Sequence, residues 1–87
     1  MDNPNPGYHL AKIQKGVLGK SSKIQEELDE LKDAEKQQSK ILALVELSDM
    51  IGAINVYLED NHPGTSIYDL INMADITRRA FENGHRK

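Results

Sequence analysis

The chain has 87 residues, a net charge of −3 and no cysteine. Its length suits one domain with a core of marginal size, and small helical chains often complete such a core with a second copy. The lack of cysteine excludes disulfides, thiolate zinc sites and cysteine nucleophiles, and the net charge argues against general nucleic-acid binding. No apolar run approaches the roughly 20 residues that span a bilayer. We therefore expect a cytoplasmic protein with neither a membrane nor a nucleic acid as partner.

Residues 1–20 are predicted to form a flexible N-terminal arm that ends in a glycine turn. Prolines, asparagines and a glycine fill residues 1–7, which is typical of a loose segment. Gly16 and Gly19 then interrupt the chain before any long helical pattern begins. Residues 21–87 form the predicted helical domain.

The first helix is expected to begin at Ser21 or Ser22 and to fade around residues 36–38. Ser22 and Gln25 have the spacing of a capping box, in which side chains satisfy the free amides of the first turn. An apolar stripe with helical spacing predicts the side that faces the core: Ile24, Leu28 and Leu31.

The second helix is expected to be capped by Ser39 and to run from Lys40 to about Asp60. Apolar residues lie on nearly every side of it, which is typical of a helix buried on nearly every side. A third helix follows Thr65 or Ser66 and ends near Gly84. The fold class is therefore all-α, and we expect a three-helix protomer that completes a helical bundle by oligomerisation, as a homodimer or homotetramer.

Two acidic groups lie inside the first two helices. Glu26, Glu27 and Glu30 share one or adjacent helical faces, and Glu46 and Asp49 are three residues apart in the most apolar helix. Side chains three or four residues apart on a helix are neighbours. If the two helices pack together, these carboxylates converge and repel one another unless a cation lies among them.

A solvated charged face is the ordinary interpretation of the first acidic group. The second group favours a metal site instead, because a carboxylate in a buried helix needs a compensating positive charge. Oxygen ligands alone point to Mg²⁺, with Mn²⁺ as the alternative, since the chain has no cysteine and no suitable histidine pair. We expect His9, His62 and His85 at the surface rather than as ligands.

The combined pattern Glu26-Glu27-x-x-Glu30, a spacer, then Glu46-x-x-Asp49 resembles the signature of the MazG-like all-α nucleoside triphosphate pyrophosphohydrolases, and small phage-encoded members look most similar. The resemblance covers residues 20–86. It implies hydrolysis of a nucleoside triphosphate (NTP or dNTP) to the monophosphate and pyrophosphate.

The same resemblance implies roles for individual residues. Glu27, Glu30, Glu46 and Asp49 would hold Mg²⁺. Glu26 would be a further ligand or would orient or deprotonate the attacking water. Basic side chains would contact the triphosphate, and the candidates are Lys20, Lys23, Arg78, Arg79 and Arg86. We predict this contact for Lys23, Arg78 and Arg79.

Two alternatives stay open from the sequence. A non-catalytic helical module could use the same bundle to bind another protein. Phosphoribosyl-ATP pyrophosphohydrolase shares the chemistry of the first assignment and differs in its substrate. The base and sugar of the nucleotide are not determined by any motif in the chain.

Overall fold

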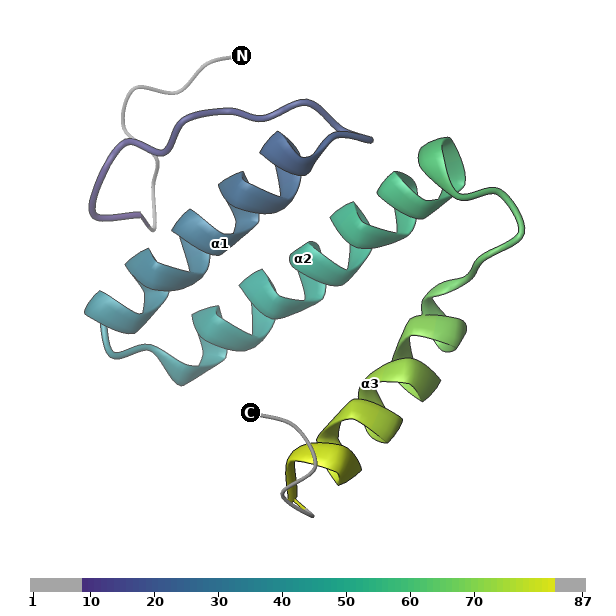
Figure 1. Ribbon diagram of the computed structural model, residues 1–87. Coiled ribbons are helices and arrows are strands. Elements are labelled where there is room, and N and C mark those ends of the chain that lie inside the picture. The colour runs from purple at the N-terminus through teal and green to yellow at the C-terminus, as the bar shows by residue number, and fades with distance from the viewer. Residues whose placement is uncertain (1–8, 83–87) are drawn as a thin grey trace.

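The computed structural model describes residues 9–82, which form three α-helices (Figure 1): α1 (Ser21–Lys36), α2 (Lys40–Asn61) and α3 (Ile67–Glu82). No strand occurs between residues 9 and 82, so the all-α class is confirmed. The helix boundaries agree closely with the predicted ones. The loose segment predicted for residues 1–7 and the predicted stop at Gly84 lie outside the described residues.

Two helix starts carry side-chain caps, and the sequence predicts the one at Ser39. The Ser39 hydroxyl accepts the backbone N–H of Leu42 at 3.1 Å, at the start of α2. At the start of α3, the Asp69 carboxylate accepts the N–H of Ser66 at 2.8 Å, and the Ser66 hydroxyl accepts the N–H of Asp69 at 3.3 Å. These reciprocal bonds satisfy amides that a helix leaves without internal partners.

The predicted capping box at the start of α1 is wrong. Lys20 is the N-cap residue there, and it makes no side-chain capping bond within the described chain. The Ser22 hydroxyl accepts the N–H of Val17 at 3.0 Å, and Gln25 donates to Asp29 at 3.0 Å. The preceding segment folds back over the helix and takes the serine that was expected to cap it.

We call residues 9–20 the N-terminal strap, because this segment runs along α1 (Figure 1). It ends in the predicted glycine turn, in which Lys20 donates to the carbonyl of Val17 at 2.9 Å. Gly19 has a φ of 91°, in the left-handed region that glycine adopts at little cost. The amide of Asn61 donates to the Gly19 carbonyl at 3.0 Å and so joins the turn to the end of α2.

Helices α1 and α2 form an antiparallel hairpin, with their axes side by side (Figure 1). The apolar stripe predicted for α1 is only half-buried. The hairpin instead buries a mixed set of side chains, of which three are apolar (Ala34, Ala53 and Leu58) and four are acidic (Glu26, Glu27, Asp33 and Glu46). A core this small and this acidic contributes little hydrophobic stabilisation by itself.

Large apolar side chains cover the outer surface of α2 and much of α3. Ile41, Leu44 and Ile51 are 76%, 68% and 54% exposed, and all three lie on one face of α2. Helix α3 contacts α2 sparsely and has no buried residue within the described chain. A single chain therefore leaves most of the apolar surface of α2 uncovered, and the burial of that surface in an oligomer stays a prediction.

We expected no apolar run that could span a bilayer. By length and composition alone, however, α2 is apolar enough to cross a membrane. It has 22 residues, and 17% of its most apolar stretch is buried. Glu46 and Asp49 interrupt that stretch. Core helices of soluble proteins, which are mostly buried, are as long and as apolar.

Candidate metal centre

The four predicted metal ligands converge between α1 and α2. Glu27 and Glu30 of α1, with Glu46 and Asp49 of α2, each offer one carboxylate oxygen, and these four oxygens all lie within 4.8 Å of one another. The helical spacing produces this arrangement, because each pair is three residues apart and so lies on one face of its helix. The antiparallel packing then brings the two faces together.

Burial makes this cluster unusual. Glu46 is completely buried, and neither of its carboxylate oxygens has a hydrogen-bond partner among residues 9–82. Oε1 of Glu27 is also buried without a partner in the described chain. Buried polar atoms are normally hydrogen-bonded, since leaving one unpaired costs about 1–3 kcal/mol and more for a charged group. Asp49 is exposed, so the cluster is open to solvent on that side.

Protonation partly relieves the repulsion among these groups. Burial, with the neighbouring carboxylates of Glu46 and Glu27, raises the pKa of Glu30 to about 8 from an ordinary value of 4.5. Burial also raises the pKa of Glu27, although the nearby Lys23 ammonium opposes that rise. A carboxyl group with a raised pKa among other carboxylates is common in functional sites.

The donor set fits a hard divalent cation. A group of four oxygen ligands suits Mg²⁺ or Mn²⁺, because these cations prefer carboxylate oxygens to softer ligands. The unpartnered oxygens of Glu46 and Glu27 are the structural observation that supports this fit. A cation there would give the two Glu46 oxygens a partner, which they lack by hydrogen bonding among residues 9–82.

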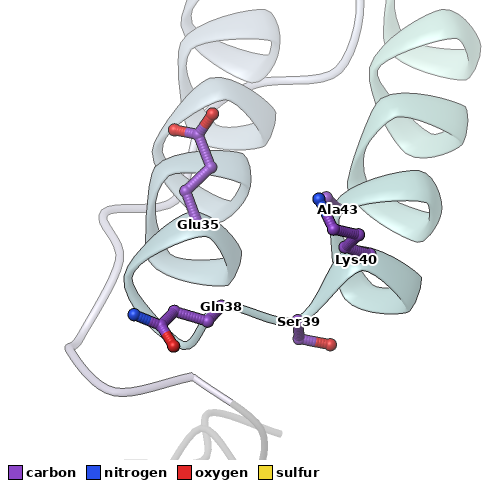
Figure 2. A pocket seen from close by; sticks show the side chains of 5 residues that line it. All are labelled: Glu35, Gln38, Ser39, Lys40 and Ala43. Carbon is purple, nitrogen blue, oxygen red and sulfur yellow. The ribbon is translucent and has the colours of Figure 1, made fainter.

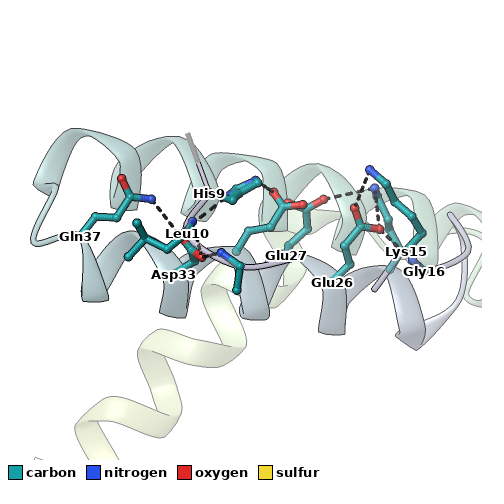
Figure 3. Close-up of polar contacts among 11 residues, drawn as sticks. His9, Leu10, Lys15, Gly16, Glu26, Glu27, Asp33 and Gln37 are labelled. Carbon is teal, nitrogen blue, oxygen red and sulfur yellow. Dashed lines mark hydrogen bonds and ion pairs between the residues drawn. The ribbon is translucent and has the colours of Figure 1, made fainter. Parts of the chain in front are cut away.

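Glu26 does not belong to this group of four. Its Oε1 accepts the backbone N–H of Gly16 at 2.8 Å and the Lys23 ammonium at 3.1 Å, and Lys15 lies 3.8 Å from its Oε2 (Figure 3). Burial favours the neutral form of Glu26, but the Gly16 amide and Lys23 outweigh it and lower its pKa. The side chain thus holds the N-terminal strap, and its assignment to the attacking water stays a prediction.

The three predicted phosphate-binding residues lie in two different places. Lys23 is beside the cluster, with its ammonium 3.3 Å from Oε2 of Glu27. Arg78 and Arg79 are on the exposed surface of α3 and both pair with Asp75, with a distance of 2.9 Å for Arg78. These two pairs lower the pKa of Asp75. Of these three residues, only Lys23 therefore lies beside the carboxylates among residues 9–82.

His9 was expected at the surface, and this expectation is wrong. Its side chain is 11% exposed, with Nε2 3.7 Å from Oε1 of Glu30 and Nδ1 4.0 Å from Oδ1 of Asp33 (Figure 3). Asp33 positions it, because the Asp33 carboxylate accepts the N–H of Leu10 at 2.9 Å and that of Ala11 at 3.0 Å. Burial opposes ionisation of Asp33, but these amides prevail and lower its pKa.

His62 is exposed beyond the end of α2, as predicted, where its ring is near that of Tyr57. His85 lies outside the described residues.

A separate open pocket lies at the turn between α1 and α2 (Figure 2). It is lined by Glu35, Gln38, Ser39, Lys40 and Ala43, and none of the four clustered carboxylates lines it. Gln38 has a φ of 57°, which lets the chain leave α1 and enter α2 within three residues. The pocket therefore follows from the turn and is distinct from the acidic cluster.

No protein-family model, no curated protein and no solved structure matches the chain. The resemblance to the MazG-like family therefore stays a prediction that depends on the two acidic motifs.

Proposed function

We propose that the protein is a divalent-metal-dependent nucleoside triphosphate pyrophosphohydrolase. The observation that carries this proposal is the convergence of Glu27, Glu30, Glu46 and Asp49, with both oxygens of the completely buried Glu46 unpartnered among residues 9–82. An acidic cluster with uncompensated buried oxygens is expensive to maintain unless a cation occupies it. The order of the acidic residues along the chain resembles a signature for this reaction.

The carboxylates of the cluster would hold Mg²⁺ or Mn²⁺. Such an ion neutralises phosphate oxygens and makes a bound water more acidic, which is the chemistry that hydrolysis of a phosphoanhydride needs. Lys23 keeps Glu27 in place through its 3.3 Å contact and adds positive charge at the edge of the site. Asp49 is exposed, so we place substrate entry on its side of the cluster.

We propose further that a second copy of the chain covers the apolar face of α2. Ile41, Leu44 and Ile51 lie along that face, and Gly52 beside them has open space, because a Cβ there would meet no other described atom within 4 Å. Small residues permit close helix packing. A partner's α3 could then bring its arginines to the phosphates, which would complete a site that one protomer leaves short of positive charge.

The activity is tested by a panel of NTPs, dNTPs and phosphoribosyl-ATP with pyrophosphate detection. We expect release from at least one compound in the presence of Mg²⁺ or Mn²⁺ and none with a chelator. Glu30→Gln and Asp49→Asn should each lower the rate by at least about 10–100-fold, because each removes a ligand. Glu35→Gln, an exposed change on the same helix, is the matched control and should retain the rate. A panel with no metal-dependent release, or fully active Glu30 and Asp49 variants, would contradict the assignment.

The oligomer is tested by light scattering after size-exclusion chromatography. Leu44→Glu should convert the wild-type oligomer to a monomer, because it places a charge on the face that a second copy would cover. Leu18→Glu changes a residue of similar exposure in the turn before α1 and should leave the mass unchanged. A wild-type protein that is monomeric at every concentration would overturn the dimer.

A non-catalytic interaction module is the second candidate, and the exposed faces of α2 and α3 favour it. Such surfaces often bind another protein. The buried carboxylates distinguish the candidates, because a module that binds through apolar faces has no need of Glu46. A protein that released no pyrophosphate and bound no divalent metal would support the module.

A further inference from the structure

We infer that His9 is a ligand of a second cation position, which its imidazole forms with Glu30 and Glu46. This inference rests on the proposed metal centre and adds to it a residue that the acidic motifs do not include. The second position shares two carboxylates with the first one and differs from it by a nitrogen ligand carried on the N-terminal strap.

The geometry of three side chains supports this position. A ring nitrogen of His9 and one oxygen each from Glu30 and Glu46 all lie within 4.8 Å of one another. Nε2 of His9 is 3.7 Å from Glu30, and the imidazole is almost buried. Glu46 supplies the independent evidence for a ligand, because its two oxygens are buried and unpartnered among residues 9–82 and it belongs to both groups of ligands.

The imidazole lies between Glu30 and Asp33, with one ring nitrogen near each carboxylate. A histidine that binds a metal usually directs its other ring nitrogen toward a carboxylate, which fixes the ring. Here Nε2 faces the cluster, and Nδ1 is 4.0 Å from Asp33 (Figure 3). Asp33 is itself held by the amide of Gln37 at 2.7 Å and by the backbone of Leu10 and Ala11. The strap is therefore fastened next to the residue that would coordinate.

Charge and ligand number also favour two ions. The four clustered carboxylates carry −4 when all are ionised, which two divalent cations balance. Glu30 and Glu46 each have two oxygens, so each can bridge two ions at the separation of about 3.5–4 Å found in two-metal sites. An imidazole nitrogen suits transition metals, whereas Mg²⁺ prefers oxygen. We therefore assign a preference for Mn²⁺ over Mg²⁺ to the position beside His9.

The test uses Mn²⁺ bound to the full-length protein, and electron spin echo spectroscopy, which detects nitrogen in the coordination shell. We expect a histidine nitrogen signal in the wild type and in His62→Gln, and its loss in His9→Gln. Titration should show two Mn²⁺ per chain in the wild type. In His9→Gln one of them should bind at least about tenfold more weakly, since even loss of an outer-shell partner costs about 10–100-fold.

Asp33→Asn tests the positioning residue. We expect it to weaken the nitrogen signal, because the amide side chain holds the strap and the imidazole less firmly than a carboxylate does. Circular dichroism on each variant establishes that the helices remain. The wild-type spectrum needs no variant and so gives an answer even if a substitution disturbs folding.

The outcomes separate this inference from the proposed function. Mn²⁺ that binds without a nitrogen signal, or with one that persists in His9→Gln, overturns the role of His9 and leaves the carboxylate site intact. A wild-type protein that binds no Mn²⁺ overturns both. Loss of the signal in His9→Gln alone, with pyrophosphate release still measurable in Mg²⁺, supports the second position.

Discussion

Glu46→Gln should stabilise the metal-free protein and abolish its stabilisation by metal. Most substitutions of a completely buried residue destabilise a protein. Here the wild-type side chain is a carboxylate without hydrogen-bond partners among residues 9–82, next to Glu27, Glu30 and Asp49. Removal of its charge ends that repulsion, and the new amide can donate to a neighbouring carboxylate. We expect a gain of about 2 kcal/mol in the free energy of unfolding, on the order of 10 °C in Tm for a domain of this size.

Added metal should make the wild type more stable than Glu46→Gln, which is the reverse of their order without metal. A ligand at 100 times its Kd stabilises the state that binds it by about 2.7 kcal/mol. Wild type should gain this in Mg²⁺ or Mn²⁺, whereas Glu46→Gln should gain little. Thermal unfolding with chelator and with metal, at one fixed protein concentration, measures both effects. Glu35→Gln should follow the wild type within about 0.5 kcal/mol. A Glu46→Gln protein that is less stable without metal and still responds to metal would refute this account of the cluster.

The metal-free protein should lose stability as the pH rises from about 4.5 to 8. Glu30 has a pKa of about 8 in the folded chain and about 4.5 when unfolded. Between these values the folded state holds a proton that the unfolded state releases, so stability falls with rising pH. The stabilisation is complete below pH 4.5 and is lost as the pH passes through 8. The expected loss is on the order of 3 kcal/mol, and Glu27 acts in the same direction.

Two other carboxylates limit stability on the acid side. The pKa values of Glu26 and Asp33 are lowered in the folded state, so their contribution is present at neutral pH and is lost as the pH falls through those lowered values. The metal-free protein should therefore be most stable near pH 5. Denaturant unfolding at pH 5, 6, 7 and 8 measures how the free energy of unfolding changes with pH.

The Glu30→Gln substitution and bound metal should each remove the decline in the free energy of unfolding between pH 5 and 8. The variant has no proton to lose at position 30. Metal needs ionised carboxylates, so its affinity increases with pH and the slope should become positive. Equal slopes with chelator and with saturating Mn²⁺ would show that the titrating group is not at a metal site.

The helices and the four-carboxylate cluster could be predicted from local spacing. Ser39, a residue type that favours the N-cap, indicates the start of α2. The three-residue spacing within each acidic pair places both of its members on one face of a helix. Their meeting required only that α1 and α2 form a hairpin. The burial of Glu46 depends on that hairpin and not on the apolar composition of α2, because Asp49 on the same helix is exposed.

The strap could not be predicted in this way, because backbone amides hold it. Asp33 binds amides 22 and 23 residues earlier in the chain, and Glu26 binds one 10 residues earlier. Amides have no sequence signature, so the position of His9 beside Glu30 was missed. One signal was present: Glu26 and Asp33 are seven residues apart, hence on one face of α1, and the strap binds along that face.

Titration of Mn²⁺ into the wild type and into Glu46→Gln, followed by isothermal calorimetry, tests the central claim most directly. That claim is that the carboxylates between α1 and α2 hold a divalent cation. We predict saturable binding by the wild type at micromolar to millimolar Mn²⁺ and its loss in Glu46→Gln, while Glu35→Gln binds as the wild type does. Absence of binding by the wild type at millimolar Mn²⁺, or equal binding by Glu46→Gln, would contradict it.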